Sequence, residues 1–354
     1  MKKIILIIFL LLLVGVPSIV LYIFREETVA TTKDVLGIKP TQYYGATVDM
    51  SQILPESVHY VTNSKGEDLI DVSKKLGINT LRITNIMSIT NDNNTPDYSH
   101  KQWEEVLGKM RKKGIYAVIL VEGNGTDTKF HSQKLQLSDY YINFVTNYIV
   151  SPNVCNFSNV LAIDIANEPL LNENNLIKLK EASQLVKSAC PTAKITIGSW
   201  RTDSGRKLPS GEPEYYWHDP KETRQLNDIV DIHSVHIYGF DKPKDGPYPD
   251  PYVLTVGYLK EIRKYTNKPV LIEEFGAGNG DALTDQNTLG SKELQKTAYE
   301  GVLKATFDFK NRNVIGAIAY LLHPRSADPE SWNITKDNGD TLLPAAYTFK
   351  QYKN

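Results

Sequence analysis

The chain has 354 residues, of which 41% are hydrophobic and 23% are charged, as in an ordinary soluble globular domain. This length suits one large α/β barrel or two smaller domains. The formal net charge of -1 excludes a strongly basic chain, so neither nucleic acid nor an acidic membrane surface is expected as an electrostatic partner.

The first element is an apolar segment at the N-terminus. Lys2 and Lys3 precede an uncharged, mostly apolar stretch, residues 4–24, which is long enough to span a bilayer as a helix and longer than the core of a signal peptide. The two lysines favour a cytoplasmic N-terminus. We therefore expect residues 1–24 to be a signal anchor, with a cleaved signal peptide as the alternative. Residues 25–40 are expected to be a polar tether to a domain at the cell membrane, facing outward, or secreted.

Beyond residue 40, strand-like segments recur through to the C-terminus. Most are short, apolar and rich in Ile, Val and Leu, as strands buried on both faces are. They cover residues 43–48, 80–84, 116–121, 160–166, 194–199, 229–238, 269–274 and 314–321.

Amphipathic stretches alternate with these strands. The clearest covers 100–113 and begins with Ser99 and Gln102 as a capping box. Prolines within 209–220 predict a loop with at most a short helix between strands five and six. The other helical stretches cover about 66–76, 135–150, 176–189, 251–266, 291–311 and 342–353. Eight strands and about eight helices predict a single (β/α)8 barrel over residues 41–354, with a doubly wound open sheet as the alternative.

Polar and aromatic residues lie at the ends of the predicted strands, where barrel enzymes place their catalytic groups. Such side chains are costly inside an apolar strand, whereas at the rim they can converge on a ligand. The alternative for each is a residue that only closes the barrel end. In chain order the candidates are Arg82, Glu122, Asn167, Glu168, Trp200, His236, Tyr238 and Glu274.

Two of these residues are the carboxylates that glycosidic-bond hydrolysis requires. Glu168 follows an apolar run in Ala166-Asn167-Glu168-Pro169, and Glu274 follows another in Glu273-Glu274-Phe275-Gly276. On these motifs the sequence resembles the clan A retaining glycoside hydrolases and is most similar to family 5, the cellulases and mannanases. Further matches are Leu81-Arg82, Val235-His236-Ile237-Tyr238 and Lys268-Pro269-Val270-Leu271-Ile272.

The resemblance implies a retaining hydrolase of β-glucan, β-mannan or another β-linked glycan. Glu168 would be the general acid and then the base, and Glu274 the nucleophile, whose charge should raise the pKa of Glu168. The resemblance further implies that Arg82 and Tyr238 hold Glu274, that Asn167 bonds the sugar 2-hydroxyl, and that His236 bonds near Glu168 or the substrate.

The aromatic residues near the predicted rim are candidate platforms for sugar rings. Trp200 is the best placed, and the loop residues 215–217 and Trp332 are further candidates. The sequence departs from the family pattern at two strand ends. Glu122 lies where the family usually has a His, and residues 317–322 contain no Trp at the end of strand eight.

Two other acids and the two cysteines complete the predictions. Successive strand residues face opposite ways, so Glu273 and Glu274 are not both expected to face the substrate, and Glu273 is expected to be a salt-bridged or supporting residue. Asp164 lies below a strand tip and is expected to be a paired structural acid. Cys155 and Cys190 fall at the bottom of one βαβ unit, where a disulfide is plausible, with two free thiols as the alternative.

Two other functions fit parts of the pattern. A carbohydrate-binding pseudoenzyme could keep the barrel without turnover, although both carboxylates are present. A metal-dependent hydrolase would need ligand motifs, but no His-x-His follows the first strand and no His-Glu-x-x-His occurs, so no metal or other cofactor is expected. The expected partner is a β-linked glycan, and we expect a monomer.

Overall fold

The computed structural model describes residues 42–352, except 85–97, 122–136, 138–140, 208–212, 218, 239, 241–248, 280–290 and 325–331. The predicted anchor and tether at 1–40 and the candidate site residue Glu122 therefore lie outside the described residues. Of the helices in the described part of the chain, none combines the length and the apolar character that crossing a bilayer requires.

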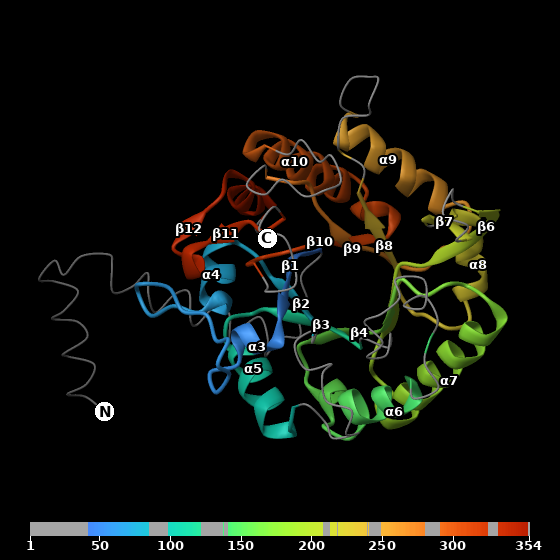
Figure 1. Ribbon diagram of the computed structural model, residues 1–354, viewed down its shortest axis with the longest axis horizontal. Coiled ribbons are helices and arrows are strands. Elements are labelled where there is room, and N and C mark those ends of the chain that lie inside the picture. Colours follow the sequence, from blue (N-terminus) through green and yellow to red (C-terminus); the bar gives the residue numbers. More distant parts are fainter. Residues whose placement is uncertain are drawn as a thin grey trace, which may run out of the picture. The chain divides into compact units, whose positions relative to one another are not determined.

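Eight parallel strands form a ring at the centre of the fold, with helices outside it (Figure 1). The strands are β1 (Tyr43–Asp49), β2 (Thr80–Thr84), β3 (Tyr116–Leu120), β4 (Val160–Asn167), β5 (Ile195–Gly198), β8 (His233–Ile237), β9 (Val270–Phe275) and β10 (Val314–Ala319). They follow the order β5-β4-β3-β2-β1-β10-β9-β8. Between β5 and β8, the carbonyl of Ile195 accepts from the backbone N–H groups of Asp231 and Ile232 at 2.8 and 3.1 Å. The sheet is thus a nearly closed barrel, and the predicted (β/α)8 fold is confirmed.

The apolar residues of the strands form two separate packing layers. The larger layer lies between the strands and the helices. The smaller one comprises Val118, Ala162, Ile232, Leu271 and Ile318. Because side chains from strands on opposite sides of a ring meet only within it, this second cluster fills the lower barrel interior and supports the polar side chains above it.

Helices follow most of the strands and cover the outside of the barrel. They are α3 (Met50–Ile53), α4 (Leu69–Leu76), α5 (His100–Lys112), α6 (Tyr141–Val145) continued by the π-helical η3 (Thr146–Val150), α7 (Glu173–Ala189), α8 (Thr223–Leu226), α9 (Pro251–Ile262), α10 (Lys292–Asp308) and the 3-10 helix η8 (Pro344–Tyr352). Short 3-10 turns are η4 (Val154–Asn156), η5 (Pro220–Glu222), η6 (Lys310–Arg312) and η7 (Asp337–Gly339). The predicted capping box of Ser99 and Gln102 begins α5 and is confirmed.

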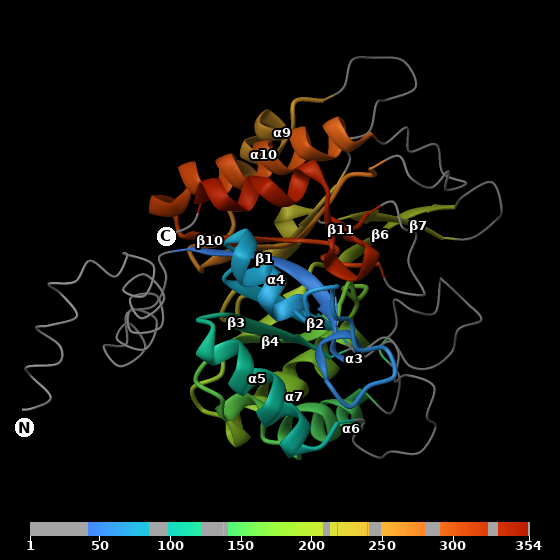
Figure 2. The same ribbon diagram turned by 90° about the vertical axis from the view of Figure 1, so that its left-hand side faces the viewer.

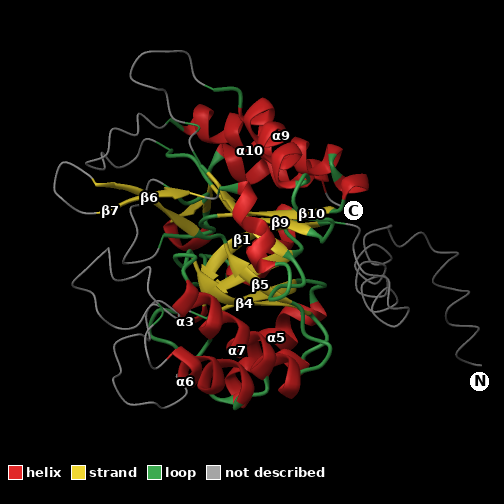
Figure 3. Ribbon diagram, turned by 90° about the vertical axis from the view of Figure 1, so that its right-hand side faces the viewer, coloured by secondary structure: helices red, strands yellow, loops and turns green. Residues whose placement is uncertain are grey.

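The segment between β5 and β8 differs from the prediction of a loop. It forms an antiparallel hairpin of β6 (Arg201–Lys207) and β7 (Pro213–Trp217), followed by the short helix α8. Pro213 is compatible with a strand because it is the first residue of β7, where a missing N–H is tolerated. Figures 2 and 3 show the hairpin projecting beyond the C-terminal ends of the barrel strands. A second small sheet pairs β11 (Thr335–Lys336) with β12 (Thr341–Leu342).

The two cysteines are joined in a disulfide, as one of the two alternatives predicted. Cys155 belongs to η4, just before β4, and Cys190 follows α7, just before β5; their Cα atoms are 5.8 Å apart. Both positions precede a barrel strand, so the bond joins two connections at the bottom of the barrel, away from the strand ends that carry the candidate catalytic residues.

Candidate active site

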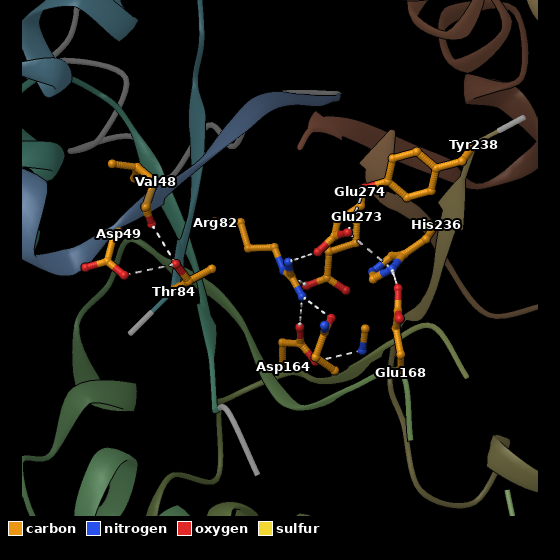
Figure 4. A network of polar contacts seen from close by, with 12 residues as sticks. Val48, Asp49, Arg82, Thr84, Asp164, Glu168, His236, Tyr238, Glu273 and Glu274 are labelled. Carbon is orange, nitrogen blue, oxygen red and sulfur yellow. Dashed lines mark hydrogen bonds and ion pairs between the residues drawn. The ribbon is translucent and has the colours of Figure 1, made fainter. Parts of the chain in front are cut away.

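Most of the described site candidates converge at the C-terminal ends of β2, β4, β8 and β9 (Figure 4). The guanidinium group of Arg82 lies at the centre of their polar contacts. Arg82 is 1% exposed, and its Nη2 donates to Asp164 Oδ2 at 2.8 Å and to Asn167 Oδ1 at 2.9 Å. Its Nη1 donates to Glu274 Oε1. One buried cation therefore joins three strands.

Glu274 is held by β2 and β8 through polar contacts. Besides the Arg82 contact, the Tyr238 hydroxyl donates to Glu274 Oε2 at 2.8 Å, and His236 Nδ1 lies 3.4 Å from the same oxygen. Burial alone would raise the pKa of Glu274. The charges of His236 and Arg82, together with the Tyr238 hydrogen bond, instead hold this pKa below its ordinary value. Glu274 is thus kept as a carboxylate, the form that a nucleophile needs.

Glu168 lies across the site from Glu274. Its backbone has φ 50°, a left-handed conformation that is uncommon for a residue other than glycine, and its N–H donates to the carbonyl of Gly198 at 2.7 Å. Glu168 Oε1 is 2.8 Å from His236 Nδ1. The Glu168 side chain is 15% exposed and that of Glu274 is 5% exposed. Glu168 is therefore the carboxyl group with the better access to water.

The two carboxyl groups are close together. One oxygen of Glu168 and one of Glu274 lie, together with a ring nitrogen of His236, within 4.8 Å of one another. The sequence predicted this pair and its three neighbours Arg82, His236 and Tyr238 at one site, and the structure brings all five together. It also places Asn167 against Arg82.

Glu273 and Glu274 both turn toward the inside of the barrel, which a regular strand would not allow. Val235 pairs with Ile272, but the next residue, His236, pairs with Glu274, so β9 contains one extra residue at Glu273. Glu273 is fully buried, and its Oε1 lies 3.3 Å from Arg82 Nε. The bulge thus brings both side chains to Arg82, although only Glu274 reaches the open side of the site, and the expected salt bridge of Glu273 is present.

Asp164 is the paired structural acid that its position predicted. Its Oδ2 accepts from Arg82, and its Oδ1 accepts from the backbone N–H of Gly198 at 2.7 Å. Gly198 leaves room for this network, because a Cβ atom there would lie 2.8 Å from Asp164 Oδ2 and 2.9 Å from Arg82 Nη2. Sequence reasoning missed Gly198. Its place at the end of β5, facing an acid in β4, is a signal only once the barrel register is known.

An aromatic cluster adjoins the Glu274 side of the site. Tyr238, Tyr320 and Trp332 pack edge to face, with ring centroids 5.6 Å apart for Tyr238 and Trp332 and 6.2 Å apart for Tyr320 and Trp332. Trp332 also covers Gly276, where a Cβ would lie 3.0 Å from the indole. Sequence reasoning missed Tyr320, which follows β10, because only a Trp was sought at that strand end.

The structure does not bring Trp200 to the site surface. Its side chain is fully buried within the main hydrophobic layer, so it presents no exposed ring face in this structure. Residues 215–217 lie in β7, whose side chains are outside the described part, as is Glu122. Trp332, which is partly exposed, is therefore the best placed of the predicted platforms whose side chains are described.

A model of the cellulase family (glycosyl hydrolase family 5) matches residues 42–324. No curated protein matches the chain.

Three solved structures with a similar fold are distant from this chain in sequence. A family 5 mannosidase from Rhizomucor miehei has a TM-score of 0.57 and 16% identity, over 89% of this chain and 93% of that one. A GH53 catalytic domain from Ignisphaera aggregans has a TM-score of 0.59 and 14% identity, over 88% and 96%. A β-glucuronidase from an uncultured Clostridium has a TM-score of 0.57 and 16% identity over 89% of this chain, which spans only 50% of that longer protein.

Proposed function

We propose that this chain, which belongs to the cellulase family (glycosyl hydrolase family 5), hydrolyses a β-linked glycan by a retaining double displacement. The observation that carries the proposal is the closeness of Glu168 and Glu274, whose oxygens approach within 4.8 Å. Retaining glycosidases have carboxyl groups about 5–5.5 Å apart, whereas inverting enzymes need about 6.5–9.5 Å to admit a water molecule.

In the first step Glu274 attacks the anomeric carbon while Glu168 protonates the leaving oxygen. The contact with His236 Nδ1 at 2.8 Å orients the Glu168 carboxyl for this transfer. In the second step Glu168 takes a proton from water, the water oxygen attacks the anomeric carbon, and Glu274 leaves as a carboxylate. Arg82 and Tyr238 stabilise that carboxylate before attack and after release.

Two further residues favour a sugar as the bound group. Asn167 Oδ1 accepts from Arg82, which fixes the side-chain amide nitrogen as the donor that the residue can offer to a sugar hydroxyl. Trp332 lies beside Tyr238, whose hydroxyl contacts the nucleophile. We propose Trp332 as the platform that replaces the missing Trp at the end of β10, the eighth strand of the barrel. Sugar rings stack their apolar faces on aromatic rings.

We further propose that residues 1–24 carry the barrel out of the cell, as a retained anchor or a cleaved leader. The uncharged, mostly apolar stretch at 4–24 supports this location. Protease treatment of intact cells that express the full chain should remove the barrel domain if it is anchored outside. Protection of the domain until the cells are lysed would contradict the proposal.

A panel of β-glucans and β-mannans tests the activity by release of reducing ends. Residues 41–354 form a compact unit, so a fragment covering 30–354 is a suitable enzyme. Glu168→Ala and Glu274→Ala should each abolish hydrolysis, whereas Glu104→Ala, at an exposed position on α5, should not. Activity that survives both substitutions would refute the mechanism, and an α-configured first product, seen by NMR, would refute retention.

The same panel separates the two other candidate functions. A carbohydrate-binding pseudoenzyme would bind a glycan without releasing reducing ends, and it would keep that affinity after Glu274→Ala. A metal-dependent hydrolase would lose activity on treatment with a chelator. The proposed mechanism uses no metal, so chelation should leave the rate unchanged.

A further inference from the structure

Glu273 is a buried acid for which the proposed reaction has no direct use. The bulge in β9 turns its side chain into the barrel, where it is fully buried. Arg82 Nε approaches at 3.3 Å but is not aligned for a hydrogen bond, and neither Glu273 oxygen accepts a well-formed hydrogen bond from a described residue. A buried carboxylate without such bonds is unfavourable, because burial strips it of water and no donor replaces the water.

The groups packed around Glu273 supply too little positive charge for it to be ionised. Arg82 from β2 also contacts Asp164 from β4 and Glu274 from β9, so three buried carboxyl groups share one guanidinium. From β8, the Ser234 hydroxyl faces Glu273, and His236 lies near Asp164 and Glu274. With all three acids ionised, Arg82 and His236 together would balance only two of their three charges.

The carboxyl groups of Glu273 and Asp164 lie within hydrogen-bonding reach of each other. Two carboxylates cannot bond, because neither donates; one proton between them makes the contact a hydrogen bond. Burial, and then the charge of Asp164, raise the pKa of Glu273 well above its ordinary value. Burial raises the pKa of Asp164 too, but the Arg82 charge and hydrogen bond oppose that rise. The proton therefore resides on Glu273.

We infer that Glu273 is a positioning residue that stays protonated and donates its proton to Asp164, which leaves the charge of Arg82 available to Glu274. This inference rests on the proposed function for its kinetic consequence only. Asp164 then accepts bonds from Glu273, Arg82 and the Gly198 N–H. Asp164 thus holds the guanidinium of Arg82 in place, and Nη1 of Arg82 donates to Glu274, the proposed nucleophile.

Infrared spectroscopy tests the protonation state directly. Glu168, which is protonated in the proposed resting enzyme, would add its own carboxylic acid band, so the measurement uses Glu168→Gln as the parent. At pH 7 this variant should keep one carboxylic acid carbonyl band, and the Glu168→Gln, Glu273→Gln double variant should lack it. Absence of the band from the parent, or its persistence in the double variant, would overturn the inference.

Kinetics test the positioning role. Glu273→Gln keeps the shape and neutrality of the acid and can still donate to Asp164, so kcat/KM should stay within about threefold of wild type. The acid limb of the pH profile of kcat/KM should not shift. Glu273→Ala should lose about 100-fold, the cost of misplacing a reacting group by about an ångström. If Glu273 were ionised, Glu273→Gln would remove a negative charge and move the acid limb to lower pH, which would refute the inference.

The two tests remain separate from the proposed function. If the wild-type chain hydrolyses no glycan, the proposed function fails, but the infrared band still decides the state of Glu273. If Glu273→Ala or Glu273→Gln does not fold, absence of the band from Glu168→Gln would still overturn the inference, because the inference requires the band at pH 7. A folded but inactive Glu273→Gln would overturn the positioning role even with the band present.

Discussion

Replacing Arg82 by Met should cost much of the stability of the domain at neutral pH. The change keeps an apolar stem but leaves Asp164 and Glu274 buried without their shared cation. Removing one partner of a buried ion pair costs about 3–5 kcal/mol. With an unfolding entropy of about 2.1 cal/mol/K per residue over about 310 residues, the Tm should fall by roughly 5–8 °C.

The loss should depend on pH in a defined direction. Arg82 lowers the pKa of Asp164 and of Glu274 in the folded protein, so its removal raises both. An acid whose folded pKa lies above its unfolded value loses stability as pH rises between the two values. The ordinary values are 3.8 for Asp164 and 4.5 for Glu274. The loss of unfolding free energy caused by Arg82→Met should therefore be complete at pH 7 and should shrink as the pH falls toward about 4.

Calorimetry or circular dichroism at pH 7 and near pH 4 measures both effects. A suitable control is Lys75→Met, because Lys75 pairs with Glu67 at the surface and its side chain is 58% exposed; its cost should stay below about 1 kcal/mol. A Tm of Arg82→Met that matches wild type at pH 7, or a deficit that does not shrink in acid, would refute the reasoning about the buried charges.

Three further changes test separate parts of the structure. Tyr238→Phe removes a hydrogen bond that lowers the pKa of Glu274, so the acid limb of kcat/KM should move to higher pH. Gly198→Ala places a Cβ within 2.8 Å of the buried charge network, so both the Tm and the rate should fall. Replacing Cys155 and Cys190 by Ser opens a loop with a sequence separation of 35, which should cost up to about 4 kcal/mol at little cost in kcat.

Matched controls accompany these changes. Tyr347→Phe alters an exposed tyrosine and should leave the pH profile unmoved. Gly257→Ala lies within α9, where a Cβ meets nothing within 4 Å, and should be neutral or stabilising. An unmoved acid limb in Tyr238→Phe, a wild-type Tm in Gly198→Ala, or a rate that collapses without the disulfide would each contradict the corresponding argument.

The strand pattern was readable from the sequence because a parallel barrel buries its strands on both faces. Runs such as 160–166 are almost wholly apolar, and a polar residue at their end is conspicuous. Strand order in a barrel then places Arg82, Glu168, His236 and Glu274 at one rim. The pairing of these residues could be predicted because it depends on topology and not on side-chain detail.

What sequence could not predict depended on irregular backbone and on burial by distant segments. The bulge at Glu273 adds one unpaired residue to β9 and so changes the side of the strand that this residue faces. No residue type in the sequence indicates such a bulge. The β6–β7 hairpin is formed by a segment whose prolines indicated a loop. Trp200 follows a barrel strand, as predicted, but other segments cover its ring entirely. Such packing is settled only by the complete fold.

The left-handed backbone at Glu168 has a consequence for how this domain tolerates change. A residue other than Gly, Asn or Asp in this conformation carries strain of about 1–2 kcal/mol, and Glu168 has φ 50°. Gly or Asn at 168 should thus raise the Tm while ending hydrolysis. At this position, a substitution that increases stability should therefore decrease turnover. A search for more stable variants that did not assay hydrolysis would therefore favour substitutions at a residue that the proposed reaction requires.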